Sequence, residues 1–181
     1  MTAPRITRLL GAVVALAACL ALAACGLDES KTDIREGEPV ELGELQYNVL
    51  FARFLNPDDV EDSEYLVGQP QLEPDQLYLG VFMQVLNKDK ESAQTIPADL
   101  ALIDSEENEY FPLPSESAYA LRLGDSVGPE DQVPALDSTA EVGPIEGSMV
   151  LYVITEETTE ARPLELEIPG EDGPAIVELD I

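Results

Sequence analysis

The sequence predicts an all-β domain, an antiparallel β-sandwich of roughly seven to nine strands. Short apolar stretches alternate with polar residues at the two-residue period of strands. Loops rich in proline and glycine separate these stretches. From residue 37 onward no segment has the 3.6-residue period of an amphipathic helix. The sequence contains no internal repeat and no sign of a second domain.

Residues 1–24 have the three parts of an export signal. Arg5 and Arg8 make the start basic, and residues 9–24 are uncharged and apolar. This run is shorter than the roughly 20 residues that a membrane-spanning helix needs. We therefore expect a signal peptide helix that is removed on export, and the alternative is an uncleaved signal anchor.

The export segment ends in small residues followed by a thiol, Leu22-Ala23-Ala24-Cys25-Gly26. This pattern resembles the lipobox of bacterial lipoproteins. In that family the thiol receives a diacylglycerol and a peptidase then cuts before it, which implies that Cys25 is lipidated and becomes the mature N-terminus. A rival pattern ends at Cys19, but it leaves an apolar run of only about seven residues. It also leaves an exposed apolar tail, so we favour Cys25.

The net charge of the chain limits the kinds of partner that it can bind. It contains 37 acidic and 9 basic residues, for a formal net charge of −28 at pH 7. Nucleic acid and anionic headgroups repel such a chain, so we expect no nucleic-acid partner. Lipid on Cys25, rather than charge, is then the means of membrane attachment. We expect the protein to be anchored on the extracytoplasmic face of the cell membrane.

The absence of histidine excludes several chemistries. A Ser-His-Asp triad, a Cys-His pair and a His-ligated zinc or copper site all need that residue type. The two cysteines, Cys19 and Cys25, would be separated by cleavage, so no disulfide or thiolate metal site is expected. We therefore expect a domain that is not an enzyme and holds no cofactor.

The domain itself is expected at residues 37–181, after a lipidated cysteine and flexible tether at residues 25–36. The apolar residues occupy even positions in residues 40–42 and odd positions in residues 45–51. This change predicts a turn or bulge near Gly43. Residues 56–75 read as a long loop. Leu77 to Leu86 is apolar on both faces and predicts a central, buried strand. Further strands are expected around residues 100–102, 110–111, 118–123, 148–154, 164–168 and 175–181, with a hairpin at 104–108.

Two stretches, Gln76 to Lys88 and Asp99 to Tyr110, resemble a family of bacterial lipoprotein domains of unknown function. Its members have an immunoglobulin-like sandwich, similar to the mycobacterial immunoprotective extracellular protein. The family pattern is an apolar strand ending in Asn, a turn, and a strand reading roughly Leu-x-Asp-x-x-Gly-x-x-Tyr. The matching residues are Asn87, Leu102, Asp104 and Tyr110. Glu107 replaces the expected glycine, and the neighbouring Asn108 tolerates the left-handed conformation of such a turn.

Few residues are candidates for a binding site. Asp58, Asp59, Glu61 and Asp62 are weak candidates for calcium, because the loop lacks the glycine and the bidentate glutamate of a calcium-binding motif. A solvated loop is the favoured interpretation there. The spaced polar residues of 104–108 are better interpreted as a hairpin tip. Six tyrosines could instead line a ligand-binding surface, but most lie in expected strands, where packing explains their presence: Tyr47, Tyr65, Tyr78, Tyr110, Tyr119 and Tyr152.

These observations favour a lipid-anchored cell-envelope protein. Its non-catalytic sandwich would bind or support a partner of the envelope. The alternative is a small-molecule or divalent-cation (calcium) binding module of the envelope. An envelope hydrolase would need two carboxylates about 5–10 Å apart in a deep pocket.

Overall fold

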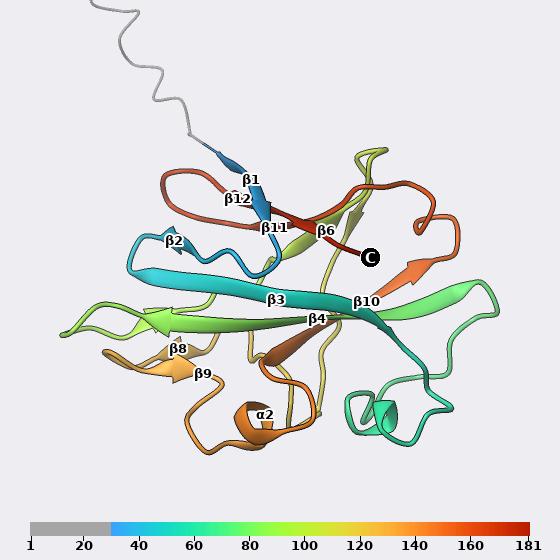
Figure 1. Ribbon diagram of the computed structural model, residues 1–181, viewed down its shortest axis with the longest axis horizontal. Coiled ribbons are helices and arrows are strands. Elements are labelled where there is room, and N and C mark those ends of the chain that lie inside the picture. The colour runs from blue at the N-terminus through green and yellow to red at the C-terminus, as the bar shows by residue number, and fades with distance from the viewer. Residues whose placement is uncertain (1–29) are drawn as a thin grey trace, which may run out of the picture.

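Two stacked β-sheets form the bulk of the computed structural model, which describes residues 30–181 (Figure 1). The expected all-β class and sandwich architecture are confirmed. The predicted signal peptide, the predicted lipidation site Cys25 and residues 26–29 of the predicted tether lie outside the described residues. Among the residues described, no helix is long and apolar enough to cross a membrane.

The first sheet contains five strands in the order β1-β12-β11-β6-β7. Their bounds are Lys31–Arg35 for β1, Ala175–Leu179 for β12, Leu164–Ile168 for β11, Ala101–Ile103 for β6 and Glu109–Tyr110 for β7. Neighbouring strands are antiparallel except β1, which runs parallel to β12. The expectation of a purely antiparallel sandwich is therefore wrong at this edge.

Strand β1 also corrects the expected extent of the tether. The sequence predicts a flexible tether at residues 25–36, yet residues 31–35 pair with β12, and the Lys31 amide donates to the Pro174 carbonyl over 2.9 Å. Only Ile34 in this strand is apolar and partly buried. An edge strand held mainly by backbone hydrogen bonds leaves little hydrophobic pattern, which is why the sequence did not reveal it.

The second sheet has β10, β4, β3 and β2 in that order, and β9 also pairs with β4. Their bounds are Ser148–Thr155 for β10, Gln76–Asn87 for β4, Leu45–Leu55 for β3, Val40–Leu42 for β2 and Gln132–Val133 for β9. The predicted central strand at 77–86 is confirmed as β4, between β3 and β10. The change of parity near Gly43 is a two-residue turn that joins β2 to β3.

Short elements complete the described chain. Strands β5 (Gln94–Thr95) and β8 (Ser126–Val127) form a separate pair. The 3-10 helix η2 (Asp62–Glu64) lies in the predicted long loop, and helix α2 covers Thr139–Val142. The strand expected at 118–123 is reduced to a single bridge between Ala120 and Met149. Twelve strands in the described residues exceed the expected number, because strands of two or three residues are too short to show a period.

The main hydrophobic core lies between the two sheets. Its most buried members come from every long strand, including Leu79, Val81 and Met83 of β4 and Leu166 and Ile168 of β11. Tyr152 of β10 is fully buried there, and its hydroxyl donates to the Leu100 carbonyl over 3.0 Å. Burial of this ring raises the pKa of Tyr152. The tyrosine is therefore neutral at every physiological pH, as packing between sheets requires.

A second core, which we call the outer aromatic cluster, covers the other face of the second sheet. Its buried members are Leu55, Tyr65, Leu66, Tyr78, Phe82, Tyr119, Ala140, Met149 and Leu151. Phe82 is its centre: its ring stacks on Phe51 with centroids 5.0 Å apart and meets the edge of Tyr65 at 5.5 Å. The loops that contain η2 and α2 lie over this face, below the sheet in Figure 1. The two cores explain why both faces of β4 are apolar.

Strand β3 contributes to both cores because its register shifts between Val49 and Phe51. Before the shift, Leu45, Tyr47 and Val49 face the core between the sheets. After it, Ala52 faces that core instead, and Phe51 packs against the outer aromatic cluster. One extra residue in the strand thus reverses which side chains point inward.

The predicted hairpin at 104–108 is confirmed, with Leu102 opposite Tyr110 and Ile103 opposite Glu109. The left-handed residue of its tip is Glu107, at φ 66°, and not the neighbouring Asn108. Glutamate thus takes a left-handed conformation, at some cost in backbone strain. Asn108 instead binds Asp104 through its side-chain amide.

Asn87 closes the end of β4. Its side chain is fully buried, and its amide nitrogen donates to the carbonyls of Ser92, Val127 and Gly128 over 2.9–3.0 Å. Its side-chain oxygen accepts the Asp89 amide at 2.9 Å. One side chain therefore ties the strand end to two loops.

We expect Asn87→Ala to lower the free energy of unfolding by about 2–4 kcal/mol, because it leaves buried carbonyls without donors. Urea denaturation followed by circular dichroism measures this. Asn48→Ala is the matched control, since the Asn48 side-chain oxygen has no hydrogen-bond partner in the described residues. Equal effects of the two substitutions would contradict the role given to Asn87.

Candidate functional site

The weak calcium candidates lie in and before η2 but do not converge. The Asp62 carboxylate is buried, forms an ion pair with Arg53 and accepts the Asn56 amide at 2.8 Å. Asp59 accepts the Glu61 amide within the same turn. In the described part of the chain no three acidic side chains are grouped closely enough to hold a metal ion. Asp62 acts as the anchor of this loop on β3.

Asp104 is the centre of a second polar network, at the tip of the β6–β7 hairpin. Its carboxylate accepts hydrogen bonds from the amides of Glu106 and Asn108, from the Asn108 side chain and from the Tyr110 hydroxyl, over 2.9–3.2 Å. The Tyr110 and Thr158 hydroxyls are also hydrogen-bonded, 2.8 Å apart. This network joins the hairpin to the turn before β11. It supports the hairpin interpretation over a metal site.

A cleft of about 540 Å³, here called the end cleft, opens at one end of the sandwich. Its walls come from three places: the β2–β3 turn, the loop between β11 and β12, and the segment from β5 to Asp99. Both sheets thus contribute to it. In Figure 1 the β2–β3 turn and the loop after β11 lie at the left end of the molecule. The lining residues are Leu42, Gly43, Glu44, Leu45, Tyr47, Gln94, Thr95, Pro97, Asp99, Pro169, Gly170 and Glu171.

Tyr47 is the buried polar residue among those that line the end cleft. Its side chain is only 1% exposed, because β3 turns it into the core between the sheets. Burial raises its pKa to about 12, so the hydroxyl keeps its proton at physiological pH. Among the hydrogen bonds of residues 30–181, none involves this hydroxyl, whereas Tyr152 in the same core has a carbonyl partner. The Tyr47 hydroxyl is not among the buried side-chain atoms of these residues that have no partner, so water in the cleft can bond to it.

Three exposed acidic residues also line the end cleft: Glu44, Asp99 and Glu171. They come from three separate loops. The ion pairs of the described residues involve Arg35, Arg53 and Lys88, and none reaches these acids. Apolar side chains, including Leu45 and Pro97, line the cleft between them. The end cleft therefore combines apolar walls with carboxylates that form no ion pair within residues 30–181.

A second cleft of about 500 Å³ shares Leu42, Gly43 and Glu171 with the end cleft. Its other side is formed by Ser30, Lys31 and Thr32, the first residues that the structure describes. The Lys31 ammonium donates to the Glu41 carbonyl. The end of the sandwich that carries the end cleft is thus also the end at which the chain enters β1.

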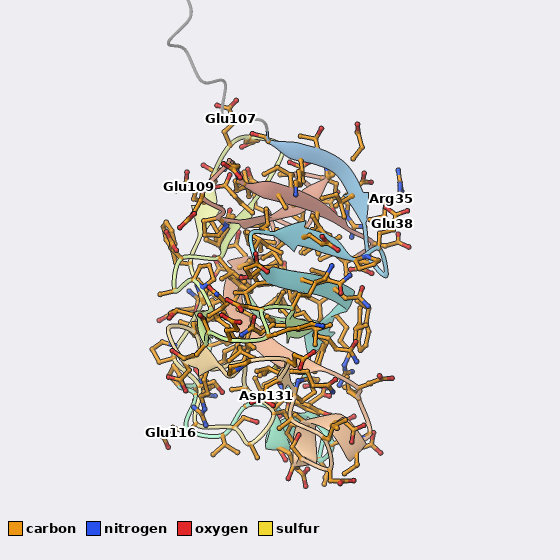
Figure 2. The ribbon with its side chains drawn as sticks, turned by 90° about the vertical axis from the view of Figure 1, so that its left-hand side faces the viewer. Arg35, Glu38, Glu107, Glu109, Glu116 and Asp131 are labelled. Atoms are coloured by element: carbon orange, nitrogen blue, oxygen red, sulfur yellow. The ribbon has the colours of Figure 1, made fainter. Side chains whose placement is uncertain are left out.

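The remaining acids are distributed over the surface. Figure 2 shows Glu107 and Glu109 at one end of the molecule in that view and Glu116 at the other, with Asp131 between them. Because acidic residues lie at both ends of the molecule in this view, negative charge alone does not mark a site. The end cleft differs in being lined by segments of both sheets and in combining three acids with apolar walls.

Sequence reasoning named Tyr47 only as one of six tyrosines and did not single out Glu44, Asp99 or Glu171. Glu44 and Tyr47 belong to one hairpin, whereas Asp99 and Glu171 lie far from it in the chain, and the three segments meet only through the stacking of the two sheets. No short motif connects them, so only the pairing of the strands could have brought them together.

The fold places the chain among β-sandwich proteins. Comparisons with known family models and with curated proteins give no match. Two solved bacterial structures are similar. The yjhA protein from Bacillus subtilis is 15% identical with a TM-score of 0.54, covering 81% of this chain and 99% of that chain. An uncharacterized β-sandwich protein from Clostridium difficile 630 is 12% identical with a TM-score of 0.50, covering 84% and 97%. At these identities the similarity establishes the fold alone.

The hydrogen bonds to Asp104 predict a pH dependence of stability. Burial disfavours its charged form, but the bonds from Asn108, Glu106 and Tyr110 outweigh this and lower its pKa below 3.8. Ionised Asp104 therefore stabilises the fold fully above the unfolded pKa, and this contribution is lost as the pH falls through the lower, folded pKa.

We expect Asp104→Asn to be less stable than the parent at pH 7 and to lose less stability between about pH 5 and pH 2. Urea midpoints measured across this range test it. Asp58→Asn is the control, because Asp58 is exposed and accepts no side-chain hydrogen bond in the described residues. An acid limb that is unchanged by Asp104→Asn would contradict the proposed coupling.

Proposed function

We propose that the chain is an extracytoplasmic lipoprotein whose immunoglobulin-like sandwich binds a partner of the cell envelope through the end cleft. Diacylglycerol on Cys25 is its proposed anchor. The observation that carries the binding role is the end cleft itself, which both sheets line with apolar side chains and with three carboxylates that form no ion pair within residues 30–181. The export signal and the pattern at residues 22–26 support the anchor.

The immunoglobulin-like topology is supported by the order of the strands. An immunoglobulin domain has strands A, B, E and D in one sheet and C, F and G in the other, with C′ added beside C in the variable type. Here β3, β4 and β10 take the places of A, B and E, and the bridge between Leu113 and Leu151 falls where D pairs with E. Strands β6, β11 and β12 take the places of C, F and G, with β7 as C′.

The start of β1 strengthens the link between anchor and cleft. Because β1 begins at Lys31, the chain from Cys25 to the sheet spans at most about 20 Å even when fully extended. Lys31 lies in the cleft that adjoins the end cleft. A lipid on Cys25 would thus keep the end cleft close to the membrane surface. A partner of the cleft would then be a component of the envelope at that depth.

We expect Cys25→Ala to remain unprocessed and to lose its lipid, because no thiol is left to acylate. Membrane fractionation, electrophoretic mobility and globomycin treatment of the parent measure this. Cys19→Ala is the matched control and should mature normally. Unchanged processing and membrane retention of Cys25→Ala would overturn the anchor, and a block caused by Cys19→Ala would favour the rival site.

Binding through the end cleft predicts position-dependent crosslinking in intact cells. A photoreactive residue at Thr95, in the cleft, should give a discrete crosslinked species that Tyr47→Phe weakens. The same residue at Glu116, outside the cleft, should not give that species. Equal crosslinking from both positions, or none from Thr95, would contradict a binding role for the cleft.

A further inference from the structure

The outer face of the second sheet is covered over only part of its length. Phe82 on this face is fully buried in the outer aromatic cluster, whereas Leu86, four residues further along β4, is 36% exposed. A groove of about 290 Å³ lies over this second part, where β9 joins the end of β4 toward the left of Figure 1. We call it the amide groove, and it is lined by Pro39, Gln46, Asn48, Gln84, Val85, Leu86 and Gln132.

The register of three strands brings four carboxamides together in this groove. On β3, Gln46 and Asn48 alternate with the residues that face the core between the sheets, so both point to the outer face. Asn48 lies directly opposite Gln84 of β4. Gln46 of β3 and Gln132 of β9 lie on either side of Leu86, each paired with it. Side chains in such positions are close enough to contact one ligand together.

The hydrogen bonds of these amides are incomplete. The Asn48 side-chain oxygen is buried and has no partner in the described residues. The side-chain nitrogens of Gln84 and Gln132 donate to the Glu146 carboxylate and the Pro134 carbonyl over 2.9 and 3.2 Å, which leaves their oxygens as acceptors for a ligand. A buried acceptor without a donor costs about 1–3 kcal/mol. A ligand that brings donors to the groove therefore removes a cost that the fold itself leaves in place.

The lining restricts the charge of that ligand. None of the residues that line the amide groove is charged, although the chain has a net charge of −28. Glu41, which lies opposite Gln46, already forms an ion pair with Lys88. An anion would be repelled by the net charge, and a cation would find no carboxylate in the lining. A hydroxyl group matches the lining, because it donates and accepts without charge, as a carboxamide does.

We propose that the amide groove binds an uncharged sugar unit. Its hydroxyls bond to the carboxamides of Gln46, Asn48 and Gln84, and its C–H face packs on Leu86 and Pro39. The groove is near the lower limit of small-ligand sites, about 300 Å³, so it suits one sugar ring better than a long stretch of chain. None of its lining residues lines the end cleft, so this inference goes beyond the proposed function and does not rest on it.

The test is a titration of the full chain, purified in detergent, with the methyl glycosides of glucose, mannose, galactose and N-acetylglucosamine. Nitrogen-labelled side-chain amides are followed by NMR. We expect at least one glycoside to shift the signals of Gln46 and Asn48 saturably, with a Kd on the order of 1 mM. The signal of Gln71, an exposed residue outside the groove, should not move. The affinity should be the same at low and high salt, because no charge pair forms.

Three variants separate binding from folding. Gln46→Met and Asn48→Leu keep roughly the volume of the side chain but remove its hydrogen bonds, so each should weaken binding about threefold to tenfold. Gln71→Met is the matched control and should bind as the parent does. The urea midpoints of all three should stay close to that of the parent, because Gln46 and Asn48 point away from the inner core.

Three results would overturn the proposal. The first is that none of the four glycosides gives saturable shifts, and the second is an unchanged affinity in both groove variants. The third is an affinity that falls steeply with salt, which would mean that a charged group is recognised. Because the titration involves neither the end cleft nor the lipid, its outcome is independent of the Cys25 and crosslinking experiments.

Discussion

Burial of β4 on both faces is the constraint on which the rest of the structure depends. One face packs against the opposite sheet, and the other packs beneath loops that a simple sandwich would not need. A strand apolar on both faces would otherwise expose Tyr78 and Phe82 to water. The long loop after β3 and the loops around α2 therefore contribute to the fold as a third layer. The register shift in β3 serves the same purpose, because it lets this strand contribute side chains to both cores.

Sequence reasoning found those elements whose pattern is set by burial. The central strand and the C-terminal strands have a hydrophobic pattern that reflects which faces are buried and which are exposed to solvent. The hairpin at Asp104 has a turn signal between two strand segments. It missed β1, which is held at an edge by backbone hydrogen bonds and buries little beyond Ile34. It also missed the outer aromatic cluster, since nothing in the spacing of Tyr65 and Tyr119 indicates that they meet with ring centroids 4.5 Å apart.

The candidate site is harder still to predict from the sequence, because its residue types are common and its residues come from separate segments of the chain. Acids are so numerous in this chain that no group of them stands out in the sequence. What distinguishes the end cleft is the contrast between two buried tyrosines of one core. Tyr152 has a carbonyl partner, while Tyr47 faces an opening with none in the described residues. This difference between the two tyrosines depends on how loops from both sheets are placed in the folded protein. The hydrophobic periodicity of the sequence does not contain that information.

The parallel pairing of β1 with β12 has a mechanical consequence. Any tension on the segment before Ser30 is transmitted first to β1, along the direction of the strand. Its hydrogen bonds to β12 then share the load in shear, rather than opening one after another as in a peeled hairpin. Pulled in this direction, β1 resists detachment from β12 more strongly than its five residues suggest. The last strand of the chain would thereby become the mechanical anchor of the first.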